Sequence, residues 1–295
     1  MLERLLTEQS SPDSRHLDKL STIQLLEIMN AADAQVAAAV AREIPRIAAA
    51  AEVIATALDL GGSLLYVGAG TSGRLGVLDA AECPPTFGVS PRLVRGIIAG
   101  GESALTQAME GVEDDPAAGA GDLEAASISG RDVLVGISAS GRSPYVLGAV
   151  AKARKINAVT CGISCVGDSE LSRAVQFPIE PLVGPEILTG STRLRAGTAT
   201  KLVLNMLSTA VMVKLGHVYG NLMVNVQPTN QKLEDRARRI IMWAADVTYD
   251  QAAELLDRAG RSVRIAILMQ KKRISRDDAE TLLQRSKGRI REALK

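Results

Sequence analysis

The 295-residue sequence contains few aromatic, histidine and cysteine residues. Aromatic side chains make up 2% of it, which leaves few rings to stack on nucleobases or to line a sugar cleft. A polar ligand must then be held by small residues and by the backbone. The three cysteines, Cys83, Cys161 and Cys165, are an odd number, so we expect reduced thiols rather than a disulfide scaffold. The spacing of Cys and His predicts no metal site.

The chain also lacks a charge excess and a long hydrophobic run. Its 34 Lys and Arg residues nearly balance 33 Asp and Glu residues, so nucleic acid is not expected as a partner. The longest apolar stretch, Leu202 to Val213, is shorter than the roughly 20 residues that cross a bilayer. Residues 1–6 carry charges where a signal peptide has its apolar segment. We therefore expect a cytoplasmic protein without a membrane partner.

Between Ser63 and about Pro181, short β-branched runs alternate with Ala- and Leu-rich segments of helical spacing. This alternation is typical of an α/β fold, in which helices cover both faces of a parallel sheet. The order of the strands in the sheet is not readable from the sequence. Five strands are predicted, over Leu64 to Val67, Leu93 to Ala99, Val133 to Ser138, Ala158 to Ser164 and Val175 to Ile179.

Helices are predicted before and after this strand region in the sequence. Residues 22–30 and 33–58 have helical patterns, with Pro45 limiting how far one straight helix can run. A mostly apolar helix is predicted from Arg193 to Lys214, and we expect it to be buried against the sheet or against a second subunit.

The C-terminal part, residues 233–295, differs in composition from the rest, with 15 Lys and Arg residues against 10 Asp and Glu residues. Short helical patterns near 250–258, 262–270 and 277–284 predict a compact helical subdomain. We favour a solvated helix surface over a nucleic-acid face for its basic residues. The predicted domains are thus residues 1–232 and residues 233–295.

The first strand runs through a Gly-rich turn into a helix, at Gly68 to Gly76. Unpaired N–H groups and the dipole of the first helical turn attract an anion, and Thr71 and Ser72 add hydroxyl donors. The spacing also fits the G-x-G-x-x-G pattern of dinucleotide sites. The acidic residue that such a site expects about 20 positions later is missing.

A second loop of this kind follows the third predicted strand. It holds Ser138, Ser140 and Ser143 around Gly141, and Pro144 suits the first turn of the next helix. Three hydroxyls at these spacings can converge on one monophosphate. Ordinary turn and capping chemistry would explain either loop alone, but two loops at the carboxyl ends of one parallel sheet favour ligand binding.

The residues of these loops resemble a known family. Gly70-Thr71-Ser72-Gly73, together with Ser138-x-Ser140-Gly141-x-Ser143, is similar to the sugar isomerase (SIS) fold, whose members bind phosphosugars through such loops. Nearly the whole chain resembles the N-acetylmuramic acid 6-phosphate etherases, and its C-terminal end is similar to their ubiquitin-associated-like (UBA-like) helices. The stretches that carry this resemblance are 70–88, 98–102, 110–114, 189–198 and 219–224.

The resemblance implies a carbon–oxygen lyase that removes the D-lactyl ether from C3 of N-acetylmuramic acid 6-phosphate. The products would be N-acetylglucosamine 6-phosphate and D-lactate, in the recycling or catabolism of peptidoglycan amino sugars. It implies no cofactor, and a homodimer in which loops of the partner complete the site. The phosphosugar-binding residues that it implies are Thr71, Ser72, Ser138, Ser140, Gly141 and Ser143.

Two other functions stay open at this point. One is a non-catalytic phosphosugar sensor similar to the glucokinase regulatory protein, which would be expected to contain two SIS domains where this chain has room for one. The other is an aldose–ketose isomerase on the same fold, which would not need the segment around Glu82.

The resemblance also implies two catalytic carboxylates, Glu82 and Glu113, which would otherwise be taken as solvated residues near helix ends. In the ring-opened sugar, the C1 aldehyde acidifies the C2 proton. A base can then remove that proton while an acid protonates the departing ether oxygen. We expect Glu113 to be the base and Glu82 the acid, which requires drier surroundings for Glu82 that favour its protonated form.

Four further residues carry groups that could serve a site. Glu186 and Lys201 fit either a supporting role in the site or a capping and surface role. His217 is expected to be structural or to lie at a subunit contact. Cys83 stands beside Glu82 but has no base at hand, so a buried thiol is expected there.

Overall fold

A computed structural model of the protein describes residues 7 and 9–295. Residues 1–6, on which the expectation of no signal peptide rests, lie outside the described residues. The chain divides into two compact units. The first is formed by the chain up to residue 81 and by residues 92–208, and the second by residues 82–91 and 209–295. The predicted helical subdomain, 233–295, falls wholly within the second unit.

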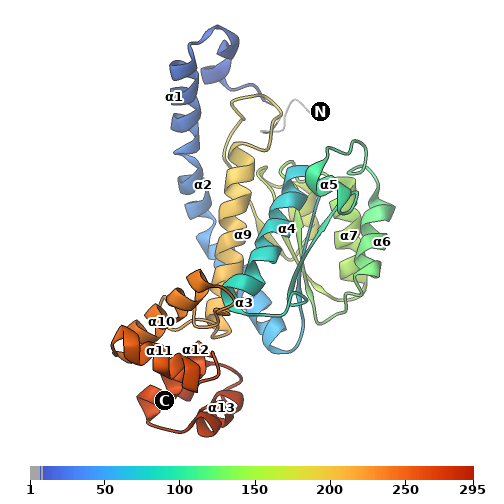
Figure 1. The fold of residues 1–295 in the computed structure, drawn as a ribbon. Coiled ribbons are helices and arrows are strands. Elements are labelled where there is room, and N and C mark those ends of the chain that lie inside the picture. The colour runs from blue at the N-terminus through green and yellow to red at the C-terminus, as the bar shows by residue number, and fades with distance from the viewer. Residues whose placement is uncertain (1–6, 8) are drawn as a thin grey trace. The chain divides into compact units, whose positions relative to one another are not determined.

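The first unit is built on one five-stranded parallel sheet, as predicted (Figure 1). The order of the strands along the sheet is β2-β1-β3-β4-β5. All residues of β1 and β3 are buried, as expected for central strands with both faces covered. The strands are β1 (Leu64–Gly68), β2 (Val94–Ile98), β3 (Val133–Ile137), β4 (Val159–Ile163) and β5 (Phe177–Ile179).

Alternate residues of β1 face opposite sides of the sheet. Leu65 and Val67 share a hydrophobic cluster with Val146 of helix α7 (Pro144–Lys155). Tyr66, between them, donates its hydroxyl to the buried Asp79 of helix α4 (Gly70–Phe87) at 3.0 Å. Helices therefore cover both faces of this strand.

The strand order creates a switch point beside β1. The chain crosses from β1 to β2 on one side, and β3 then pairs with β1 on the other side. In open α/β sheets, the ligand crevice lies outside the carboxyl ends of the strands at such a point. The segments that leave β1 and β3 at this edge are the two loops rich in Gly, Ser and Thr.

The helices predicted over 22–30 and 33–58 are present, and the second is interrupted near Pro45, as expected. The segment 33–58 contains two helices rather than one, because Pro45 stands in the first turn of α3, where proline is tolerated. In Figure 1, α6 and α7 run side by side along the sheet. The remaining helices of this unit are η2 (Pro12–Ser14), η3 (Leu17–Lys19), α1 (Thr22–Asp33), α2 (Val36–Arg42), α3 (Ile44–Asp59), α5 (Ser103–Thr106), α6 (Pro116–Ala125) and α8 (Glu170–Ala174).

Two helices, α4 and α9 (Arg195–Lys214), continue from the first unit into the second. Within α4, Pro84 and Pro85 have no N–H to donate to the preceding turn, so the helix is weakened close to residue 82, where the units divide. By length and composition, α9 is apolar enough to cross a membrane, a property it shares with core helices of globular proteins. In this structure 56% of the most apolar 18-residue segment of α9 is buried.

A buried carboxylate joins two segments at the amino end of the sheet. Asp132 accepts hydrogen bonds from the N–H and hydroxyl of Ser63 at 2.6 and 2.7 Å. It also accepts from the N–H and hydroxyl of Ser129 at 2.7 and 2.8 Å. Burial alone would raise the pKa of Asp132, but these four hydrogen bonds outweigh it and hold the pKa below its usual value.

The second unit has a helical core of its own. Buried residues such as Ile240, Leu255 and Ile267 belong to one hydrophobic cluster. Trp243, the single tryptophan of the sequence, is 60% exposed on α10. The three predicted helices of this part are confirmed, and α10 and α14 add to them. The helices are α10 (Gln231–Ala245), α11 (Tyr249–Arg258), α12 (Val263–Lys272), α13 (Arg276–Arg285) and α14 (Ile290–Ala293).

Candidate active site

A cavity of about 250 Å³ lies where the segments after β1 and β3 meet. It coincides with the switch point of the sheet. Six of the predicted site residues line it, whereas Gly141 and Glu82 are not among the lining residues. The lining consists of Ala69, Gly70, Thr71, Ser72, Glu113, Ile137, Ser138, Ala139, Ser140, Ser143, Gly190 and Thr192.

The first wall of the cavity is the amino terminus of α4. Because α4 starts at Gly70, Thr71 and Ser72 stand in its first turn, where backbone N–H groups have no partner within the helix. Both side chains are half-buried and line the cavity. Hydroxyl and N–H donors together with the positive end of an 18-residue helix make this wall suitable for an anion.

The second wall is the loop between β3 and α7, and Gly141 fixes its shape. This glycine has φ +67°, its N–H donates to the Ser138 carbonyl at 2.9 Å, and its carbonyl accepts from Leu171 N–H at 2.9 Å. A Cβ at this position would lie 2.3 Å from Cβ and Oγ of Ser169. Gly141 therefore shapes the loop rather than lining the cavity.

Behind Gly141 lies a cluster of hydroxyls that was not predicted. Ser169, the N-cap of α8, is 3.0 Å from Ser164 Oγ and 2.8 Å from Ser172 Oγ. Ser164 Oγ also donates to the Val166 carbonyl at 2.9 Å. These contacts hold Ser169 against the loop. The sequence shows Ser169 only as a capping residue, because its closeness to Gly141 depends on the tertiary fold.

The third wall comes from the loop before α9, through Gly190 and Thr192. Glu186 is 1% exposed and accepts from the N–H groups of Arg195 and Ala196, both at 2.9 Å. It thus caps α9 and fixes both ends of this loop, which is the capping role considered for it. Lys201 is exposed on α9.

Glu113 lies in a turn three residues ahead of α6 and is among the residues that line the cavity. Its backbone carbonyl accepts from Tyr145 N–H at 3.0 Å and from Ser143 Oγ at 3.3 Å. Glu82 stands near the end of α4, within the second unit. Both glutamates are exposed, so the drier surroundings expected for Glu82 are not found among the described residues.

The sequence of this chain is similar to that of known proteins. Residues 46–154 match the model of the glucokinase regulatory protein N-terminal SIS domain. The chain is 47% identical over 293 residues to the N-acetylmuramic acid 6-phosphate etherase of Clostridium beijerinckii, and the match covers 99% of this chain and 96% of that relative. It is 50% identical to the protein of the same name from Pectobacterium atrosepticum, with 99% and 97% covered.

The chain belongs to the N-acetylmuramic acid 6-phosphate etherase family. The resemblance noted in the sequence is thereby confirmed, and neither the regulator nor the isomerase is favoured.

Solved structures share the SIS-type fold of this family. A Bacteroides fragilis protein described as a phosphosugar isomerase involved in capsule formation superimposes with a TM-score of 0.50 at 18% identity, covering 68% of this chain and 98% of that one. The phosphoheptose isomerase of Neisseria gonorrhoeae has a TM-score of 0.49 at 19% identity, covering 65% and 98%. Because only 18% of the residues are identical, the match to the Bacteroides fragilis protein shows a shared fold and nothing more.

His217 is half-buried and Cys83 is buried in this etherase-family chain. His217 Nδ1 is 2.9 Å from Asn225 Nδ2, and burial, with Arg264 and Arg289 nearby, lowers the pKa of His217 to about 4. Its ring is therefore neutral near pH 7. The buried-thiol prediction for Cys83 is confirmed, since that residue is 2% exposed.

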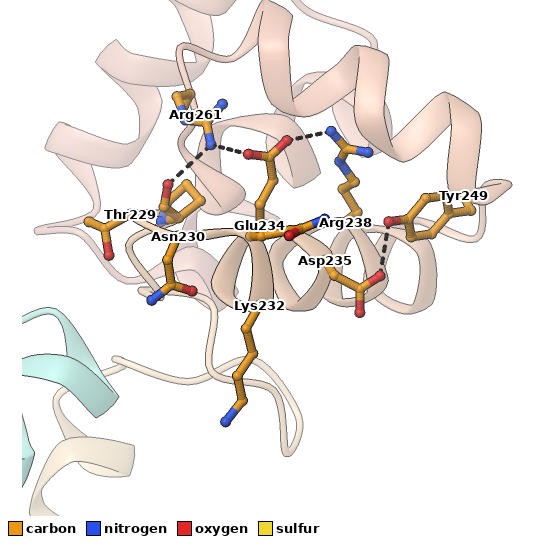
Figure 2. A pocket seen from close by; sticks show the side chains of 10 residues that line it. Thr229, Asn230, Lys232, Glu234, Asp235, Arg238, Tyr249 and Arg261 are labelled. Carbon is orange, nitrogen blue, oxygen red and sulfur yellow. Dashed lines mark hydrogen bonds and ion pairs between the residues drawn. The ribbon is translucent and has the colours of Figure 1, made fainter.

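A larger cavity, of about 750 Å³, lies within the second unit of the etherase-family chain (Figure 2). Several of its charged groups pair with one another, whereas Lys232 extends away from them. Glu234 bridges Arg238 and Arg261, and Arg261 lowers the pKa of Glu234 through their hydrogen bond. Asp235 accepts from the Tyr249 hydroxyl at 2.9 Å. These pairs favour a structural role for the basic residues here, in line with a solvated helix surface.

Proposed function

We propose that this protein cleaves the D-lactyl ether of N-acetylmuramic acid 6-phosphate and releases N-acetylglucosamine 6-phosphate and D-lactate. It would act in the cytoplasm as a carbon–oxygen lyase of amino-sugar recycling or catabolism. Relatives of this name at 47–50% identity over nearly the full chain support the substrate and the reaction. The observation that carries the proposal is the cavity in which Glu113 meets the hydroxyls of both loops.

The phosphate of the substrate would bind between the two loops. Thr71 and Ser72 bring hydroxyl and N–H donors from the start of α4, and Ser138 and Ser140 bring hydroxyls from the second loop. Each hydrogen bond to an ionised phosphate contributes about 1.5 to 3 kcal/mol. Binding energy at this remote group orients C2 and C3 of the sugar against the catalytic carboxylates.

The reaction would then proceed by elimination and hydration. With the sugar ring open, Glu113 removes the C2 proton, and the C3–O bond breaks as the lactate oxygen takes a proton from Glu82. Water next adds to C3 of the unsaturated aldehyde with Glu82 as general base, while Glu113 returns a proton to C2. Both glutamates end the cycle in their starting protonation states, and no cofactor takes part.

The protein would work as a homodimer. Ile23 and Leu26 on α1 are 62% and 53% exposed, and Met206 on α9 is 39% exposed. Exposed apolar faces of this kind mark contact surfaces between proteins. If loops of the partner copy complete the site at the exposed Glu82, they would supply the drier surroundings that a general acid needs. Light scattering should give twice the chain mass of 31.1 kDa, and Leu26→Glu should yield an inactive monomer. A fully active monomer would contradict this arrangement.

The decisive assay is D-lactate release from N-acetylmuramic acid 6-phosphate, coupled to a D-lactate dehydrogenase. Glu82→Ala should still exchange the C2 proton of the product sugar with deuterium from solvent but release no lactate, whereas Glu113→Ala should do neither. Glu124→Ala, at a side chain 72% exposed on α6, is the matched control. No lactate release by the unmodified protein would refute the function. Exchange lost in the Glu82 variant and kept in the Glu113 variant would reverse the two roles.

A further inference from the structure

Residues 82–87 form the end of α4, and two prolines loosen this end from the rest of the helix. Pro84 and Pro85 have no N–H, so the helical hydrogen bonds that would reach the carbonyls of residues 80 and 81 are missing. Glu82 lies in this end of α4, which belongs to the second unit, whereas α4 up to residue 81 belongs to the first. The place of Glu82 therefore depends on what holds residues 82–87 within the second unit.

Asn225 holds the end of α4. The last carbonyls of a helix have no partner within it, and the Phe87 carbonyl accepts instead from Asn225 Nδ2 at 2.6 Å. Gly88 follows with φ +64°, the left-handed conformation in which many helices end. A Cβ on Gly88 would lie 2.7 Å from the Asn225 carbonyl oxygen and 2.9 Å from Asn225 Cβ, so no side chain separates the two residues. A residue 138 positions after Phe87 therefore caps α4.

Asn225 is itself fixed within the second unit. Its neighbours Val224 and Val226 are 1% and 3% exposed and belong to the hydrophobic core of this unit. Asn225 Nδ2 is also 2.9 Å from His217 Nδ1, and the neutral ring of His217 can accept the second N–H of the amide. Both N–H bonds of the Asn225 amide are thus directed at acceptors, one of them in α4.

Stability alone does not account for the amide of Asn225. The residue is 5% exposed, and its Oδ1 has no hydrogen-bond partner within the part of the chain that the structure describes. A buried acceptor that lacks a partner costs at least as much free energy as one hydrogen bond contributes. The gain from the two N–H groups is therefore largely offset. What the amide does achieve is to connect the core of the second unit with the segment that carries Glu82.

We propose that Asn225 is a positioning residue for Glu82, through which the second unit takes part in catalysis. Its amide fixes the carbonyl of Phe87, in the same short helical segment as Glu82, and thereby sets where the Glu82 carboxylate lies. This inference rests on the proposed function, in which Glu82 protonates the departing lactate oxygen and then activates water. It concerns these steps at C3 and leaves the removal of the C2 proton to Glu113.

The test compares the two halves of the reaction in one variant. By the proposed mechanism, C2 deuterium exchange on N-acetylglucosamine 6-phosphate, followed by NMR, needs Glu113 alone. Release of D-lactate at saturating N-acetylmuramic acid 6-phosphate needs Glu82 as well. Asn225→Ala should slow lactate release about tenfold or more and leave the exchange rate within about twofold of the wild type, because a small misplacement of an acid lowers the rate of its own step. A merely structural role would slow both steps together.

Asn230→Ala is the matched control for this variant. Asn230 is another asparagine of the second unit, and its side chain accepts from Leu233 N–H at 2.9 Å as the N-cap of α10. Its loss removes a capping hydrogen bond from the same unit, at the other end of a different helix. Both lactate release and C2 exchange should stay at the wild-type rates in Asn230→Ala. Equal slowing of both steps in Asn225→Ala, or lactate release at the wild-type rate, would overturn the proposal.

Variants of His217 test the same contact if Asn225→Ala does not fold. His217→Leu removes the acceptor for the second N–H of the Asn225 amide and should slow lactate release more than C2 exchange. His217→Asn keeps an acceptor close to the place of Nδ1 and should recover most of the lactate release. Equal effects of these two variants on both steps would overturn the proposal. Absence of lactate release by the unmodified protein would instead refute the proposed function itself, so the two failures are distinguishable.

Discussion

Replacing Gly141 with Ala tests whether the second loop of the cavity has the shape described. Left-handed backbone at φ +67° costs a non-glycine residue about 1 to 2 kcal/mol. The added Cβ would lie 2.3 Å from Ser169 Cβ, and crowding of this kind costs about 1 to 3 kcal/mol. Ser169 cannot move freely, because its hydroxyl lies within hydrogen-bonding distance of Ser164 and Ser172. We expect a total loss of about 2 to 5 kcal/mol in the free energy of unfolding.

Urea denaturation followed by circular dichroism measures this loss, and calorimetry with N-acetylglucosamine 6-phosphate measures the effect on the cavity. If the loop moves to relieve the strain, at least one hydrogen bond to the phosphate is lost and the Kd should rise about tenfold or more. Gly121→Ala on α6 is the matched control. A Cβ there meets no atom within 4 Å, and alanine should stabilise the helix by about 0.5 to 1 kcal/mol. Wild-type stability and affinity in Gly141→Ala would refute the reasoning.

Three further predictions concern buried polar groups and thiols. Asp132→Asn should lower the free energy of unfolding by about 1 to 3 kcal/mol at pH 7, because four hydrogen bonds hold the folded pKa of Asp132 below its unfolded value. The stabilisation by ionised Asp132 is present above its unfolded pKa and is lost as the pH falls through its folded pKa. The free energies of unfolding of variant and wild type, measured by urea titration, should therefore converge below about pH 4. A difference that does not change with pH would contradict this. Tyr145→Phe removes the hydrogen bond to Asp122 and should cost about 1 to 2 kcal/mol in the same titration; an unchanged midpoint would argue against it. Burial raises the pKa of Cys161 and Cys165 to about 12, so both thiols should react with a thiol reagent only in the unfolded protein, and rapid labelling of the native protein would count against the burial described.

Most of the fold could be predicted from local patterns in the sequence. The strands and the C-terminal helices α11, α12 and α13 were predicted to within a few residues, because β-branched runs and helical spacing act over short segments, whereas α10 and α14 were not predicted. Thr71, Ser72, Ser138 and Ser140 were likewise visible as hydroxyls that follow strands. The resemblance to a family added Glu113, which the structure brings to the same cavity.

Contacts between distant segments could not be predicted in the same way. The position of β1 between β2 and β3 depends on strand pairing across tens of residues, and it is this order that brings both loops to one edge. The contact of Ser169 with Gly141 and the Ser143 hydrogen bond to Glu113 likewise join parts of the chain that no local pattern connects. A serine in a loop rich in serine looks the same whether it faces a ligand or a neighbouring carbonyl.

The lone indole of Trp243 makes the second unit optically distinct. It is 60% exposed on α10, and the first unit contains no tryptophan. Tryptophan emission during denaturation therefore follows the C-terminal helices alone, while far-ultraviolet ellipticity sums over both units. If the units lose their structure at different urea concentrations, the two signals will separate into distinct curves, and their midpoints will give each unit its own stability without cutting the chain.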